Sequence, residues 1–303
     1  MATIVGIHGL ANKPLPDVEK AGWIDAIKEG LSKNCDGFDP GALDFHLVYW
    51  ASFMYRYALH RDAGYPMDSH FDDEPYIEAL PRALKRHDDG ILDAALRTFG
   101  NLADIVTDRV AEEHAFDWAT GPLTERLLKD LQAYYSGKKV RDAQDNMRPA
   151  RDVICEGLAA KLKELRAQGR EIILISHSMG TIIAYDVLRD LCKADPGFAV
   201  QHLITLGSPL GLSYVKTKVA NERGERRSPT AVRGTWVNFA DRNDPVSLDT
   251  HLSDDYGANA GGIRVRDDVV ANDYVGERGR PNPHKIYGYL RTPEFSEHLK
   301  SLL

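Results

Sequence analysis

Apolar and polar positions along the chain follow two patterns, short apolar runs and longer stretches with helical spacing. Three apolar runs are rich in β-branched residues, at 3–7 (TIVGI), 171–176 (EIILIS) and 202–208 (HLITLGS). Such runs are typical of strands whose two sheet faces are both covered. Residues 18–34 and 147–169 carry apolar side chains at helical spacing instead, which predicts amphipathic helices.

The order of these segments predicts the fold class. Further strands are predicted at 43–50 and 235–241, and a helix at 181–192 follows the strand at 171–176. Strands that are separated by helices form a mainly parallel sheet with right-handed crossovers. The sequence therefore predicts an α/β protein, a single domain over 1–303 with a mainly parallel central sheet flanked by helices.

Residues 55–118 interrupt this alternation. The segment is charged and rich in His and Asp, and its part at 90–110 carries apolar residues along one broad helical face. We expect a helical cap or lid inserted in the domain. Its apolar stripe either covers an acyl-binding groove or packs against the sheet, and the sequence does not choose between the two.

Composition and charge narrow the function classes. The net charge of −7 argues against a nucleic-acid partner, which needs a basic face. No apolar stretch approaches the length of a membrane span, and MATIVGIHGL at the start has no basic segment, so we expect a cytoplasmic protein. The 3 cysteines lack metal-binding spacing and predict reduced thiols rather than a metal site. The oligomeric state is not indicated.

The sharpest chemical signal is the turn between the strand at 171–176 and the helix after it. It reads Ser176-His177-Ser178-Met179-Gly180. A serine hydroxyl becomes a useful nucleophile when it is exposed, close to a base and beside a donor for the developing oxyanion. A tight strand-to-helix turn supplies the exposure, and the helix start supplies backbone N–H groups.

The pattern S-x-S-x-G resembles the nucleophile elbow G-x-S-x-G of the α/β-hydrolase superfamily, with Ser176 in place of the first glycine. The first strand ends in an H-G dipeptide, as in many members of this superfamily. The resemblance implies that the backbone N–H groups of Leu10 and Met179 form an oxyanion hole. His8, Gly9 and His177 lie next to these donors in the sequence and are candidate substrate-binding residues. His8 is also expected to shape its loop.

The resemblance also implies an acid and a base downstream of the nucleophile. Asp244 begins a D-P-V segment like the acid loop of many α/β-hydrolases, and Asp241 is the second candidate. His284, in RGRPNPHKIYGYL, resembles the terminal H-x-x-Y segment and is the expected base. His251 is the alternative, whereas His298 lies in a predicted terminal helix and is expected at the surface.

Together these signals predict a serine hydrolase. Ser178 would attack a small-molecule or lipid ester, His284 would move the proton, and Asp244 would orient His284. No cofactor is expected, because side chains and backbone amides complete this chemistry. A thioesterase or an acyltransferase would use the same residues, and a non-catalytic interaction protein on a hydrolase scaffold is the alternative from another class.

Overall fold

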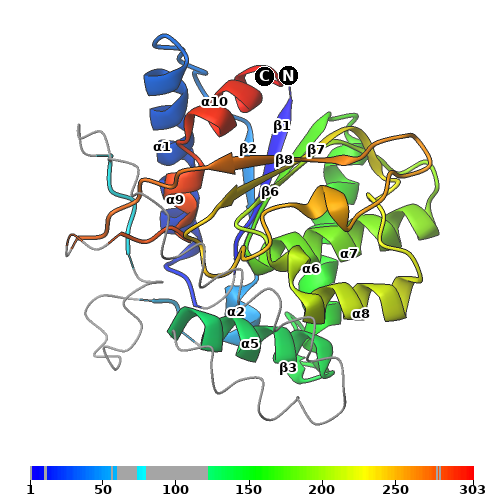
Figure 1. Ribbon diagram of the computed structural model, residues 1–303. Helices are drawn as coiled ribbons and strands as arrows, with labels where there is room; N and C mark the ends of the chain where they lie inside the picture. Colours follow the sequence, from blue (N-terminus) through cyan, green and yellow to red (C-terminus); the bar gives the residue numbers. More distant parts are fainter. Residues whose placement is uncertain are drawn as a thin grey trace.

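Six strands form one sheet in which every neighbouring pair is parallel (Figure 1). The computed structural model describes residues 2–9, 12–55, 57–59, 74–79, 122–277, 279 and 281–303. The order across the sheet is β2–β1–β5–β6–β7–β8. The strands span Thr3–Ile7 (β1), Phe45–Val48 (β2), Ile172–His177 (β5), Val200–Leu206 (β6), Val232–Asp241 (β7) and Val265–Val270 (β8). This confirms the predicted α/β class and the mainly parallel sheet.

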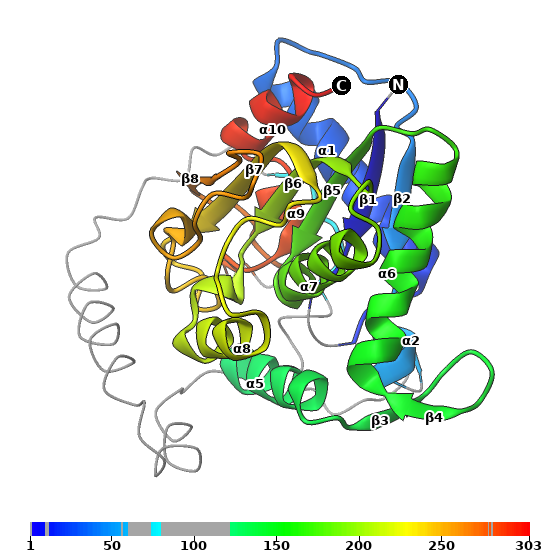
Figure 2. The same cartoon turned by 90° about the vertical axis from the view of Figure 1, so that its right-hand side faces the viewer.

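Helices cover both faces of the sheet (Figures 1 and 2). One face packs against α1 (Pro16–Asn34), α9 (Ile286–Tyr289) and α10 (Pro293–Lys300). The other packs against α5 (Pro122–Tyr135), α6 (Ala150–Ala167), α7 (Met179–Ala194) and α8 (Ser213–Arg223). In β5, Leu174 faces the second layer while Ile173 and Ile175 face the first. Because side chains alternate along a strand, burial on both faces explains the continuous apolar run.

The strand order places a topological switch point beside the predicted nucleophile. From β1 the chain crosses to β2 through α1 on one face, and it returns to β5 through α6 on the opposite face. Because the two connections run on opposite faces of the sheet, β1 and β5 form a switch point of the kind at which α/β proteins bind ligands. His8-Gly9 follows β1 and Ser178 follows β5.

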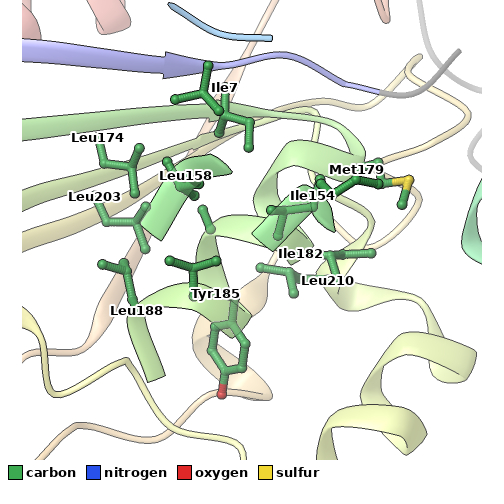
Figure 3. Packing of buried hydrophobic residues seen from close by; sticks show 14 of the residues in the cluster. Ile7, Ile154, Leu158, Leu174, Met179, Ile182, Tyr185, Leu188, Leu203 and Leu210 are labelled. Atoms are coloured by element: carbon green, nitrogen blue, oxygen red, sulfur yellow. The ribbon is translucent and has the colours of Figure 1, made fainter. Parts of the chain in front are cut away.

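Helix α7, which begins directly after Ser178, is buried along most of its length. Figure 3 shows Met179, Ile182 and Tyr185 of this helix packed among side chains of α6 and the sheet. The helix also carries a buried carboxylate, Asp186, with 2% of its surface exposed. Two groups donate to Asp186 Oδ2: the hydroxyl of Tyr134 on α5 at 2.9 Å and the guanidinium of Arg151 on α6 at 2.6 Å.

Replacing Asp186 with alanine is expected to lower the free energy of unfolding by about 2 kcal/mol, because it leaves the buried phenol of Tyr134 without its acceptor and removes one of the two carboxylates that face Arg151. Asp190→Ala, one turn later, is the matched control: Asp190 pairs with Arg223 at the surface, so its loss is expected to cost less than about 1 kcal/mol. Urea unfolding of both variants measures the difference. Equal losses would show that Asp186 does not tie the helices together.

Several elements differ from the sequence prediction. No strand was predicted at β8, and a hairpin of β3 (Lys139–Arg141) and β4 (Met147–Pro149) lies where a loop and the start of a helix were expected. Helix α8 was not predicted either. Three short elements complete the described fold: α2 (Ala51–Met54), η2 (Pro209–Gly211) and η3 (Leu252–Asp254).

Most of the predicted cap at 55–118, including the helix at 90–110, lies outside the described residues. Its described part at 74–79 is irregular and packs beside α1 and α9. Glu29 of α1 accepts from Tyr76 Oη at 2.9 Å and from the backbone N–H of Ala79 at 2.8 Å. Arg291, after α9, donates to the carbonyl of Ile77 at 2.6 Å. The helical cap and the single domain over 1–303 both stay predictions.

Candidate active site

Ser178 occupies a strained corner between β5 and α7. Its backbone has φ 53° and ψ −130°. Residues other than glycine rarely adopt this conformation, which costs about 1–3 kcal/mol. The backbone on either side fixes the corner. Ser178 N donates to the carbonyl of Leu206 at 2.9 Å, and the hydroxyl of Thr181 donates to the Ser178 carbonyl at 2.7 Å.

Two glycines make room for this corner. A Cβ on Gly9 would lie 2.6 Å from the Cβ of Ser178, and a Cβ on Gly180 would lie 2.7 Å from the carbonyl oxygens of Ile7 and His8. Both separations are far inside van der Waals contact. Ser176, the departure from the first glycine of the motif, is accommodated because its hydroxyl donates to the carbonyl of Ile204 at 3.0 Å.

Three side chains from distant parts of the chain meet at this corner. His284 Nε2 lies 2.9 Å from Ser178 Oγ, and His284 Nδ1 lies 2.9 and 2.8 Å from the two carboxylate oxygens of Asp244. Ser178 follows β5, Asp244 lies in the loop after β7, and His284 lies between β8 and α9. Their exposed fractions are 0%, 1% and 6%.

The chemistry of these groups fixes the direction of the hydrogen bonds. A carboxylate only accepts, so Nδ1 of His284 carries the proton that faces Asp244. Nε2 is then free to accept the hydroxyl hydrogen of Ser178. This arrangement can take a proton from Ser178 and stabilise the imidazolium that forms.

The alternative acid and base candidates lie elsewhere. The oxygens of Asp241 bind backbone groups instead of a histidine. They accept from the N–H of Asn243 in the same loop at 2.7 Å and from the N–H of Asn272 after β8 at 2.6 Å. Burial raises the pKa of Asp241, and the two N–H donors oppose that shift. His251 is exposed and pairs with the neighbouring Thr250 hydroxyl.

His298 is not at the surface as expected. It is half-buried on α10 against Phe239, and burial lowers its pKa to about 4.

The histidine after β1 is engaged by the chain itself. His8 is fully buried, its Nε2 accepts from Trp50 N at 2.9 Å, and its Nδ1 donates to the carbonyl of Gly9 at 2.9 Å. Burial lowers the pKa of His8 to about 3, so the ring is neutral at ordinary pH. These contacts shape the loop that ends in Gly9.

The histidine before the nucleophile supports the predicted base. His177 Nε2 donates to the backbone carbonyl of His284 at 2.9 Å, and the two rings lie 4.7 Å apart. Burial holds the pKa of His177 well below its usual range, so the ring stays neutral. Substrate contacts by His8, Gly9 and His177 stay predictions.

Half of the predicted oxyanion hole is described. Met179 is the first residue of α7, and the first N–H groups of a helix have no acceptor within it. Its N–H therefore lies at the positive end of the helix, next to Ser178. Leu10, the other predicted donor, lies outside the described residues.

Sequence reasoning missed Tyr289. The tyrosine of the H-x-x-Y segment is Tyr287, and its hydroxyl faces Glu19 of α1 at 3.4 Å. The tyrosine that contacts the acid is Tyr289, whose hydroxyl lies 2.7 Å from Asp244 Oδ2. A helix of four residues is too short for periodicity to show which of two nearby tyrosines faces the site.

Comparison with known proteins gives no further guide: no protein-family model matches the chain, and neither does any curated protein. Among the described helices, none is long and apolar enough to cross a membrane. Over the same part of the chain, no three His, Cys, Asp or Glu side chains gather as a set that could hold a metal ion.

Proposed function

We propose that the chain is a serine hydrolase that cleaves carboxylic esters through an acyl-enzyme. The observation that carries the proposal is the continuous contact from Asp244 through His284 to Ser178 at a strained strand-to-helix corner. Such a corner costs free energy and persists where the surrounding structure holds it, often at functional sites. A serine that served only as a turn residue would need neither the strain nor the imidazole.

The placement of the three residues supports assignment to an α/β-hydrolase type of fold. The nucleophile, the acid and the base occur along the chain in the order Ser, Asp, His, as in that family. Each lies in a loop at the carboxyl end of a parallel strand, where catalytic residues of α/β proteins gather. A mostly parallel sheet with helices on both faces is compatible with that family.

The proposed reaction proceeds in two steps. Ser178 Oγ attacks the acyl carbon while His284 Nε2 takes its proton, and the N–H groups of Met179 and Leu10 bind the oxyanion. The imidazolium returns the proton to the leaving alcohol, and the acyl group stays on Ser178. Water then attacks the acyl carbon while His284 Nε2 takes its proton. The bond from the acyl carbon to Ser178 Oγ breaks, the imidazolium returns the proton to Oγ, and the carboxylic acid leaves. Asp244 orients His284 and stabilises its charge throughout.

Covalent labelling tests this proposal. A fluorophosphonate with a short alkyl chain is expected to modify wild-type protein and Ser176→Ala but not Ser178→Ala, with the adduct located by peptide mass spectrometry. Ser176→Ala is the matched control, since it removes a buried hydroxyl two residues away. A short chain is needed because Ser178 has no exposed surface, so neighbouring groups must move to admit the probe.

The labelling result separates the classes. An adduct on Ser178→Ala would place the reactive group elsewhere and contradict the assignment of the nucleophile. A folded wild type without any adduct would favour a non-catalytic interaction protein. Initial rates on matched p-nitrophenyl esters and thioesters, with and without an alcohol acceptor, then distinguish esterase, thioesterase and acyltransferase activity.

A further inference from the structure

The carboxylate of Asp244 has a partner that the proposed reaction does not use. Tyr289, the last residue of α9, is completely buried, and its hydroxyl lies 2.7 Å from Asp244 Oδ2. The same hydroxyl accepts from the backbone N–H of Asp241 at 3.0 Å. A phenol therefore bridges the end of β7 and the loop that carries the acid.

The direction of this hydrogen bond follows from its two partners. A phenol oxygen has one hydrogen, and the carboxylate of Asp244 can only accept. Since the Asp241 N–H already donates to the oxygen, the hydroxyl hydrogen faces Asp244 Oδ2. Burial, reinforced by the negative charge of Asp244, raises the pKa of Tyr289 well above its usual range. The group is therefore a neutral donor at any working pH.

The other carboxylate oxygen is held as well. Asp244 Oδ1 accepts from the backbone N–H of Val246 at 2.8 Å, so each oxygen has one donor besides His284. The space around this pair is kept clear by Gly207, whose φ is +53°. A Cβ there would lie 2.7 Å from Asp244 Oδ2 and 3.1 Å from the ring of Tyr289. The two donors prevent the carboxylate from turning away from His284.

We propose that Tyr289 is a positioning residue, whose hydroxyl holds the Asp244 carboxylate in the orientation that His284 Nδ1 requires. The expected effect on kcat rests on the proposed function, whereas the expected effect on the orientation of Asp244 and His284 does not. Tyr289 touches neither the nucleophile nor a substrate by any contact described, so it acts through Asp244.

Loss of the hydroxyl releases one of the two oxygens of the acid. Asp244 Oδ2 then keeps His284 as its one described donor, while Oδ1 stays bound to the Val246 N–H. The carboxylate can pivot about that remaining bond, so the imidazole is less well aligned with Ser178.

The test is Tyr289→Phe, with Tyr287→Phe as the matched control. Both changes remove one buried hydroxyl from α9, but that of Tyr287 faces Glu19 rather than the acid. Tyr289→Phe is expected to lower kcat by about 10- to 100-fold, the loss typical of one hydrogen bond to a charged group, with KM within about twofold. Tyr287→Phe should keep the wild-type kcat and KM.

A second measurement does not depend on activity. The proton on His284 Nδ1, identified by its absence in His284→Gln, is expected as a strongly downfield ¹H NMR signal in wild type and Tyr287→Phe. In Tyr289→Phe it should move and exchange faster with water. If the wild type neither hydrolyses esters nor labels, a displaced signal still supports the positioning role while the proposed function fails. An unchanged signal, or an unchanged kcat in an active enzyme, overturns the proposal.

Discussion

Ser178→Ala and His284→Ala are each expected to reduce kcat for ester hydrolysis by roughly 10⁴-fold or more, and the double variant should lose little beyond either single one. The reason is that the two side chains perform one proton transfer across the 2.9 Å between Ser178 Oγ and His284 Nε2. Once either atom is absent, the other has no partner with which to act. Steady-state kinetics on a p-nitrophenyl ester measures the three losses.

Folding controls accompany this experiment. Ser178→Ala removes the hydroxyl but keeps a Cβ on a backbone with positive φ, so its thermal unfolding is compared with that of wild type and Ser176→Ala. Losses that multiplied in the double variant would mean that Ser178 and His284 act independently. That result would contradict the proposed mechanism even if each single variant were inactive.

Asp244→Asn is expected to lower kcat by roughly 10³- to 10⁴-fold with an intact fold. An amide can present its NH₂ group to His284 Nδ1, which then accepts, and the ring proton moves to Nε2. With Nε2 protonated, the base can no longer accept the hydroxyl hydrogen of Ser178. The loss therefore comes from the wrong tautomer rather than from a missing side chain.

Asp241→Asn is the comparison for this variant. Asp241 precedes the acid by three residues and is equally buried, but its oxygens bind the backbone of its own loop and of Asn272. The amide can keep one of these two acceptors, so we expect a loss of stability and a change in kcat of less than about tenfold. A larger loss of kcat in Asp241→Asn than in Asp244→Asn would make Asp241 the catalytic acid.

The strand order explains why residues so far apart can form one site. Ser178 and His284 are separated by 106 positions and Asp244 and His284 by 40. In a parallel sheet all carboxyl ends lie at the same edge, so three loops after β5, β7 and β8 meet there. Because β1 and β5 are neighbours, Gly9 after β1 lies against Ser178 after β5, a contact that only glycine permits.

Where the sequence prediction failed, local pattern carried too little information. Strand β8 reads VRDDVV and, among the described strands, pairs with β7 alone at the edge of the sheet. Its charges therefore occupy partly exposed positions, and no apolar run appears. Helix α8 buries only Val215 and Val219 among its side chains, so its sequence shows little helical periodicity. The hairpin of β3 and β4 has three residues in each strand, too few for alternation to be seen.

The sequence by itself determined those features in which burial produces a pattern among neighbouring residues. Strands β1 and β5, covered on both faces, appear as apolar runs, and the small residues beside Ser178 mark a close turn. Tertiary structure alone decided the strand order, the contact of Asp244 rather than Asp241 with His284, and the choice of Tyr289 over Tyr287 as the partner of the acid. These depend on which way a side chain points in a loop or a single helical turn. Contacts between distant segments set that direction, and no local periodicity records it.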